Sequence, residues 1–110
     1  MDMTWIDAAD HSVLVARSWL EVEAGRAAIL IYDIDGAVYA TAAICPHHAA
    51  FLSQGSFAGE HVDCPRHMGQ FHIPTGTQTR GPACDALRVY PVEVRGGRVW
   101  VEISPDPKSA

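Results

Sequence analysis

The feature that most constrains the fold of this chain is a pair of short cysteine–histidine motifs in the middle of the sequence. The first is CPH at residues 45–47 and the second is CPRH at residues 64–67, with residues 48–63 between them. Each motif offers one thiolate and one imidazole beside a proline. Two such turns facing each other supply two sulfurs and two nitrogens, which is the ligand set of a metal site. The sequence therefore predicts a fold in which these two loops meet.

Two kinds of metal site use this ligand set. A structural zinc ion takes two cysteines and two histidines around one tetrahedral centre, and a typical finger pairs cysteine with cysteine and histidine with histidine along the chain. A 2Fe–2S cluster of the mixed kind takes two cysteines on one iron and two histidines on the other. Each loop here carries one cysteine and one histidine, which favours the cluster, because each loop then contributes to both irons.

Length and charge limit what the chain can be. It has 110 residues, 48% of them hydrophobic, which suits one domain with one core and leaves no room for a second catalytic domain. We predict a single domain over residues 1–104, with a flexible tail over residues 105–110. The formal net charge of −5 argues against nucleic acid and anionic membranes as partners. No signal peptide or membrane span is visible, which predicts a cytoplasmic protein.

Turn signals between apolar runs predict an all-β fold of short strands. Asp35-Gly36 lies between two apolar runs and predicts a hairpin, because a type I′ turn needs positive φ at both central positions. A second hairpin is predicted from residues 87–94 and 98–103. Residues 45–82 lack regular alternation and are interpreted as a subdomain inserted between the two hairpins. The other expected elements are an edge strand at residues 4–9 and a helix within residues 8–20.

The two motifs and the residues around them resemble the Rieske iron–sulfur family. The resemblance covers about residues 3–103 and is strongest to the stand-alone Rieske ferredoxins of bacterial multicomponent aromatic-ring oxygenases. It implies an antiparallel β-sandwich or barrel-like base with an inserted cluster-binding subdomain at about residues 45–82. The segments that carry it are DGAVYATAAICPH (35–47), LSQG (52–55), GQF (69–71), TG (75–76), RGPAC (80–84), YPVEV (90–94) and GGRVWVEI (96–103).

The resemblance implies one 2Fe–2S cluster of the Rieske type. Cys45 and Cys64 would ligate one iron, and His47 and His67 would ligate the other iron, near the protein surface. These four residues are the predicted metal-binding and cofactor-binding residues, and no catalytic residue is expected. Cys84 has no partner at motif spacing and is interpreted as a free thiol.

Two positions near the motifs depart from respiratory Rieske proteins, in which a serine and a tyrosine form hydrogen bonds to cluster sulfurs. The matching residues here are Gly69 and Phe71, which carry no hydroxyl group. Hydrogen bonds to sulfur stabilise the more negative, reduced cluster, so their loss lowers the reduction potential. We therefore predict a potential near the bottom of the Rieske range, roughly −150 mV.

The implied function is that of an electron-transfer ferredoxin, part of an enzyme system without substrate chemistry of its own. A flavin-containing ferredoxin reductase would donate electrons from NADH or NADPH, and a terminal aromatic-ring dioxygenase of aromatic hydrocarbon catabolism would receive them. Both contacts are expected to be transient, with a monomeric ferredoxin. The predicted docking surface is an apolar tip around Pro46, Phe51, Pro65 and Met68.

Three other functions fit the same residues. The chain could be the small Rieske-like subunit of an assimilatory nitrite reductase, or the ferredoxin of a diiron monooxygenase. A zinc-stabilised interaction module, colourless and without redox activity, is the third. The sequence assigns no firm role to the remaining histidines. His48 is interpreted as solvated at the cluster rim, with a docking contact as the alternative, and His72 as an outward-pointing residue on a strand. His61 is interpreted as solvated and is placed in a turn.

Overall fold

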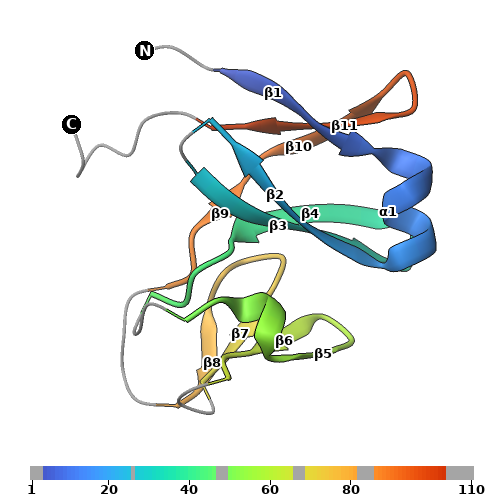
Figure 1. The fold of residues 1–110 in the computed structure, drawn as a ribbon. Coiled ribbons are helices and arrows are strands. Elements are labelled where there is room, and N and C mark those ends of the chain that lie inside the picture. Colours follow the sequence, from blue (N-terminus) through green and yellow to red (C-terminus); the bar gives the residue numbers. More distant parts are fainter. Residues whose placement is uncertain (1–3, 26, 47–49, 66–68, 82–85, 104–110) are drawn as a thin grey trace.

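The structure, a computed structural model, describes residues 4–25, 27–46, 50–65, 69–81 and 86–103. Within these residues it contains one short α-helix, one 3₁₀ turn and three antiparallel sheets. Two sheets form the part that we call the base, and the third belongs to the part that we call the insert (residues 50–65 and 69–81). Figure 1 shows the base above and the insert below. The predicted all-β fold is confirmed.

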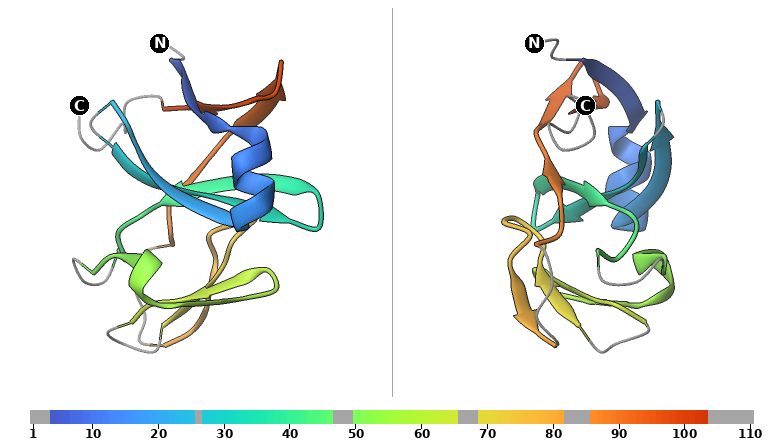
Figure 2. Two further views of the ribbon diagram at one scale, coloured as in Figure 1. Left: turned by 45° about the vertical axis from the view of Figure 1, so that its right-hand side comes forward. Right: turned by 90° about the vertical axis from the view of Figure 1, so that its left-hand side faces the viewer.

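The base consists of two sheets with a hydrophobic core between them. The first sheet has the strand order β1 (Trp5–Asp10), β11 (Arg98–Glu102), β10 (Val92–Arg95), and the second has the order β2 (Trp19–Ala24), β3 (Ala27–Ile34), β4 (Ala37–Ala42), β9 (Val89–Tyr90). The core between them contains Ala9, Leu14, Ala24, Ile29, Ile31, Ala40, Val99 and Val101. In the three views of Figures 1 and 2 the second sheet lies between the first sheet and the insert.

Strand β3 is buried on both faces, because it has a core on each side. Ile29 and Ile31 belong to the core of the base, whereas Leu30 and Tyr32 belong to a second core that is shared with the insert. All four side chains are almost fully buried. Side chains alternate across a strand, so an unbroken apolar run is what a strand with two buried faces requires. The apolar run at residues 27–34, which predicted one arm of a hairpin, is therefore also the strand that separates the two cores.

The insert is a small antiparallel sheet that follows β4 and precedes β9 in the chain. Its strands are three residues long each, and a 3₁₀ turn, η1 (Leu52–Gln54), leads into them. Strands this short show no alternation in a sequence, which is why they were not predicted. Their order in the sheet is β5 (Ser56–Ala58), β6 (His61–Asp63), β7 (Gln70–His72), β8 (Gln78–Arg80).

The two predicted hairpins have different outcomes. The turn between β3 and β4 is confirmed, with φ of 52° at Asp35 and 89° at Gly36. The second hairpin is confirmed only from β10 to β11, because residues 87–94 are not one strand. Val89 and Tyr90 pair with β4 in the second sheet, and the chain then passes through Pro91 to the first sheet. Proline has no N–H to donate to a ladder, so the strand divides at this residue.

The helix expected within residues 8–20 is shorter than that range. Helix α1 spans His11–Arg17 and begins at Asp10, whose carboxylate accepts hydrogen bonds from the backbone N–H groups of Ser12 and Val13. The Ser12 hydroxyl also donates to this carboxylate, and these bonds hold the pKa of Asp10 below its usual value. The helix ends at Ser18, and the chain continues as β2, a strand that was not predicted. In the part of the chain that the structure describes, no helix is long and apolar enough to cross a membrane.

Gly76 lies between β7 and β8 of the insert and contacts the segment that returns from the insert to the base. Its carbonyl accepts a hydrogen bond of 2.8 Å from the N–H of Leu87. Its φ is +78°, and a Cβ atom at this position would lie 2.0 Å from the carbonyl oxygen of Leu87. Only glycine fits both the backbone conformation and the close approach. Gly96, in the β10–β11 turn, has a φ of +59° but no atom within 4 Å of a Cβ atom built there.

These two glycines form a matched pair for a stability test. Gly96→Ala places a side chain in the left-handed region and should cost about 1–2 kcal/mol. Gly76→Ala adds a clash with the backbone of Leu87, so it should lower the melting temperature by clearly more than Gly96→Ala does. Thermal unfolding followed by circular dichroism measures both. Equal losses would contradict the close approach of residues 76 and 87.

Candidate functional site

The two motif loops are closed in the same way at their bases. The backbone N–H of Cys45 donates to the carbonyl of Ala50 (2.9 Å), and the N–H of Cys64 donates to the carbonyl of Gly69 (2.7 Å). In both loops the acceptor lies five residues after the cysteine. The first loop is also held by a bridge between Ile44 and Phe51, and the second extends from the β6–β7 ladder. The sequence therefore builds two similar loops, each with a cysteine at its first position.

Both cysteines lie in one hydrophobic core. Their exposed fractions are 4% for Cys45 and 3% for Cys64. The same core contains Leu30 and Tyr32 from the insert-facing side of β3, so two cysteines distant in sequence share the same apolar surroundings. The other buried members of this core are Leu30, Tyr32, Ala43, Ala50, Leu52, Val62, Phe71, Ile73 and Leu87. The structure thus places the two predicted thiol ligands in the same core.

The predicted histidine ligands, His47 and His67, lie outside the described residues, as do His48 and Cys84. Along the chain, His47 falls between Cys45 and Ala50, and His67 falls between Cys64 and Gly69. The ligand assignment of the two histidines therefore stays a prediction.

Tyr32 places an uncharged hydroxyl group in the core that contains Cys45 and Cys64. Its hydroxyl lies 2.8 Å from the Thr41 hydroxyl, which in turn donates to the carbonyl of Ala42. Burial raises the pKa of the Tyr32 phenol well above its usual value, although the hydrogen bond with Thr41 acts in the opposite direction. The phenol is therefore neutral over the physiological range.

Glycine brings two backbone segments together beside the second loop. A Cβ atom at Gly81, whose φ is +110°, would lie 2.8 Å from the Cα atom of Gly69. A Cβ atom at Gly69 itself would meet nothing closer than 3.8 Å, and the β-carbon of Cys64 would be 4.0 Å away. Position 81 therefore requires glycine, whereas position 69 has room for a small side chain, with Arg80, Cys64 and Gln78 as its nearest neighbours.

His61 and His72 make contacts that the sequence did not predict, although His72 lies on a strand and is partly exposed, as expected. They face each other across the β6–β7 ladder with ring centroids 5.3 Å apart, and His61 is in a strand and not in a turn. His72 also bonds through Nδ1 to the Thr75 hydroxyl (2.9 Å) and through Nε2 to the Glu60 carboxylate (3.0 Å). This histidine pair lies at the end of the β6–β7 hairpin that is farther from Cys64, and its contacts connect the two strands there.

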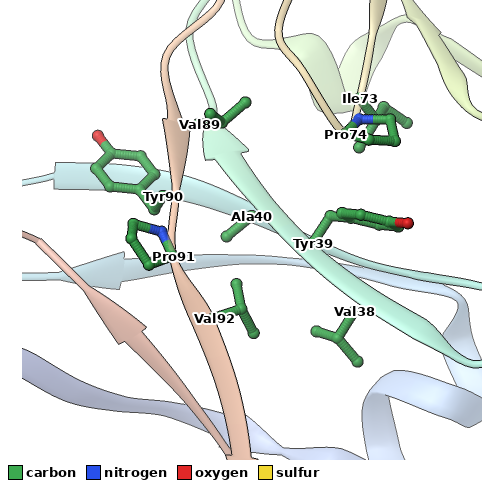
Figure 3. Close-up of a pocket in the computed structure, with 9 residues that line it drawn as sticks. All are labelled: Val38, Tyr39, Ala40, Ile73, Pro74, Val89, Tyr90, Pro91 and Val92. Atoms are coloured by element: carbon green, nitrogen blue, oxygen red, sulfur yellow. The ribbon is translucent and has the colours of Figure 1, made fainter.

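A cavity of about 380 Å³ lies on the side of the molecule where the second sheet meets the insert. Figure 3 shows its lining, which comes from β4, from residues 89–92 and from the turn at Ile73 and Pro74. The described residues that line it are all uncharged, and none is a cysteine or histidine: Val38, Tyr39, Ala40, Ile73, Pro74, Val89, Tyr90, Pro91 and Val92. It offers no metal ligand, so we place the candidate metal centre at the two loops.

A 2Fe–2S cluster fits the two loops as far as the structure describes them. Cysteine thiolates are the ligands that hold iron–sulfur clusters, and both cysteines are buried in one water-excluding core. The sequence of each loop contains one motif histidine, so the two loops together offer the two imidazoles that a mixed cluster needs. No group of three or more cysteine, histidine, aspartate or glutamate side chains suited to a metal ion occurs among the described residues.

Comparison with known proteins agrees with the predicted type of cluster. The family described as "Rieske [2Fe-2S] domain" matches residues 4–91. The ferredoxin component of the naphthalene 1,2-dioxygenase system of Pseudomonas aeruginosa is 33% identical over 104 residues, which are 94% of this chain and 100% of the relative. The biphenyl dioxygenase ferredoxin subunit of Pseudomonas sp. (strain KKS102) is 33% identical over 103 residues, 93% of this chain and 94% of the relative.

The fold is also similar to that of a solved structure. One chain of the complex of reduced oxygenase and oxidized ferredoxin in carbazole 1,9a-dioxygenase superposes with a TM-score of 0.82 at 31% sequence identity. The match covers 92% of this chain and 94% of that chain. Together these matches confirm the resemblance inferred from the two motifs.

Proposed function

The chain belongs to the Rieske [2Fe-2S] domain family, and on this premise we propose that it is the ferredoxin of a multicomponent aromatic-ring oxygenase. The observation that carries the proposal is the pair of buried cysteines on similarly closed loops, in a chain that matches ferredoxin components over almost its whole length. Such a chain carries one 2Fe–2S cluster and transfers electrons. The substrate chemistry belongs to the oxygenase.

The proposed ligands are Cys45 and Cys64 on one iron and His47 and His67 on the other. When bound, the cluster supplies one-electron redox chemistry. The protein holds the two cysteine sulfurs in place through the hydrogen bond at the base of each loop. Burial of both thiols excludes water from the sulfur side of the site.

The proposed partners are a flavin-containing reductase, which takes electrons from NADH or NADPH, and a terminal aromatic-ring dioxygenase. A docking surface for both would lie around the two loops, where Pro46, Phe51 and Pro65 are exposed. Met68, the fourth predicted member of this surface, lies outside the described residues. Transient redox complexes bury little area, so a small apolar patch suffices. We further propose a cytoplasmic monomer in which residues 1–104 form one domain.

Cluster binding can be tested with a matched pair of cysteine substitutions. We expect the wild-type protein to be red-brown and to give, after reduction with dithionite, the EPR signal of low average g-value that mixed cysteine–histidine clusters produce. Cys64→Ala removes a proposed ligand and should abolish the visible absorption, whereas Cys84→Ala should leave it unchanged. A colourless wild-type protein that contains one zinc ion, even after anaerobic reconstitution with iron and sulfide, would contradict the proposal.

The room at Gly69 allows a test of the predicted low potential. Gly69→Ser would place a hydroxyl next to Cys64, where it can donate to the sulfur and stabilise the reduced cluster. The reduction potential should therefore rise. Gly69→Ala, which adds the same carbon without a donor, should shift the potential much less. Redox titration followed by visible absorption measures both, and equal potentials of the two variants would contradict the effect of the hydroxyl.

Phe51 is the most informative residue for the docking surface, because its side chain is large and its exposed fraction is 38%. Phe51→Ala should weaken binding to the oxygenase roughly fivefold, about 1 kcal/mol, without changing the reduction potential. Val94→Ala is the control, since Val94 is 41% exposed but lies on β10 of the base. Stopped-flow electron transfer at varied oxygenase concentration gives the binding constants. Equal effects of both substitutions would place the docking surface elsewhere.

A further inference from the structure

We propose that Asp63 and Arg80, neither of which is a ligand, tune the reduction potential of the cluster in opposite directions. The carboxylate of Asp63 lowers the potential, and the guanidinium of Arg80 raises it. This inference rests on the proposed function, because it takes Cys64, the chain neighbour of Asp63, as a ligand of the cluster.

The register of the insert sheet places the pair beside the second loop. Ser56 pairs with Asp63, Asp63 pairs with Gln70, and Gln70 pairs with Arg80, so one residue from each of the four strands stands in a single row. Residues paired across antiparallel strands have their side chains on the same face of the sheet. The row is the last one before Cys64. Its charges therefore lie at the base of the loop that carries a proposed ligand.

Hydrogen bonds hold the carboxylate of Asp63 at the centre of this row. Its oxygens accept from Gln70 Nε2 (3.1 Å) and from Ser56 Oγ (3.4 Å), and Arg80 Nη2 lies 3.4 Å away. Thr79 Oγ1 donates to the side-chain oxygen of Gln70 (2.8 Å), which orients the Gln70 amide toward Asp63. The carboxylate thus has a fixed position, and its charge acts on the site from one direction.

Both charges face the same hollow as Cys64. This hollow has a volume of about 460 Å³, and Cys64, Pro65, Asp63 and Arg80 are among the residues that line it. The side chains of Asp63 and Arg80 are 31% and 51% exposed, so water screens their fields in part. The remaining effect is expected to be modest and to depend on salt.

The sign of each effect follows from the charge that reduction adds. Reduction places one electron, taken from a reduced donor, on the cluster, and no bond to either side chain forms or breaks. A negative charge nearby disfavours this added charge and lowers the potential, whereas a positive charge favours it and raises the potential. Two single substitutions in one salt bridge should therefore shift the potential in opposite directions, which loss of a structural contact would not do.

The experiment compares Asp63→Asn and Arg80→Gln by redox titration followed by visible absorption, with dithionite as reductant. We expect a higher potential than that of the wild type for Asp63→Asn and a lower one for Arg80→Gln. The double variant should lie between them, and both shifts should shrink as the salt concentration rises from 0.01 to 1 M, since the Debye length falls from about 30 to about 3 Å. Arg80→Lys keeps the charge and should restore the wild-type potential.

The salt bridge between Asp7 and Arg98 in the base provides matched controls. Its atoms are 2.9 Å apart and its side chains are 40% and 43% exposed, but it joins β1 to β11. Asp7→Asn and Arg98→Gln change the net charge by the same amounts and should leave the potential unchanged.

Shifts of Asp63→Asn and Arg80→Gln in the same direction, or shifts no larger than those of the controls, would overturn the inference. If Asp63→Asn does not retain the cluster, the comparison of Arg80→Gln with Arg80→Lys decides alone: equal potentials would reject the inference. A wild-type protein without a 2Fe–2S cluster would instead reject the proposed function. The two failures are therefore distinguishable.

Discussion

The burial of β3 on both faces is the constraint on which the rest of the structure depends. One face of the strand completes the core of the base, and the other supplies Leu30 and Tyr32 to the core that contains both cysteines. A three-residue strand cannot form a stable sheet alone, and the insert sheet has only such strands. The insert therefore depends on β3 for apolar surface, and the rigid base fixes the positions from which the two loops extend.

The same core has two roles that impose different demands. As a core, it needs large apolar side chains such as Leu52 and Phe71, which exclude water. As a metal site, it needs thiols that can ionise, and an apolar environment disfavours charge. Metal coordination resolves this conflict, because a thiolate bound to a metal is stabilised directly. Cluster binding and folding of the insert are thus expected to be coupled, as they are in other small metal-binding units.

The features that the sequence predicted correctly are those that neighbouring residues determine by themselves. Asp35-Gly36 specified its turn because few residue pairs accept positive φ, and the spacing of the two motifs specified a metal site because few ligand sets fit it. The sequence did not predict that Pro91 divides a run between two sheets, since the choice of partner strand is a tertiary property. The side-chain row around Asp63 could not be predicted for the same reason, because it depends on the register of four short strands.

The position of the charged row suggests how one fold can serve different potentials. The loops fix the ligands, and each closes through backbone atoms, so these contacts tolerate many side chains. The row before Cys64 is partly exposed, and its side chains can change without disturbing the core. Charges at such a site act on the cluster through space, whereas changes in the core would alter packing. A surface row next to a buried ligand therefore separates the adjustment of the potential from the stability of the fold.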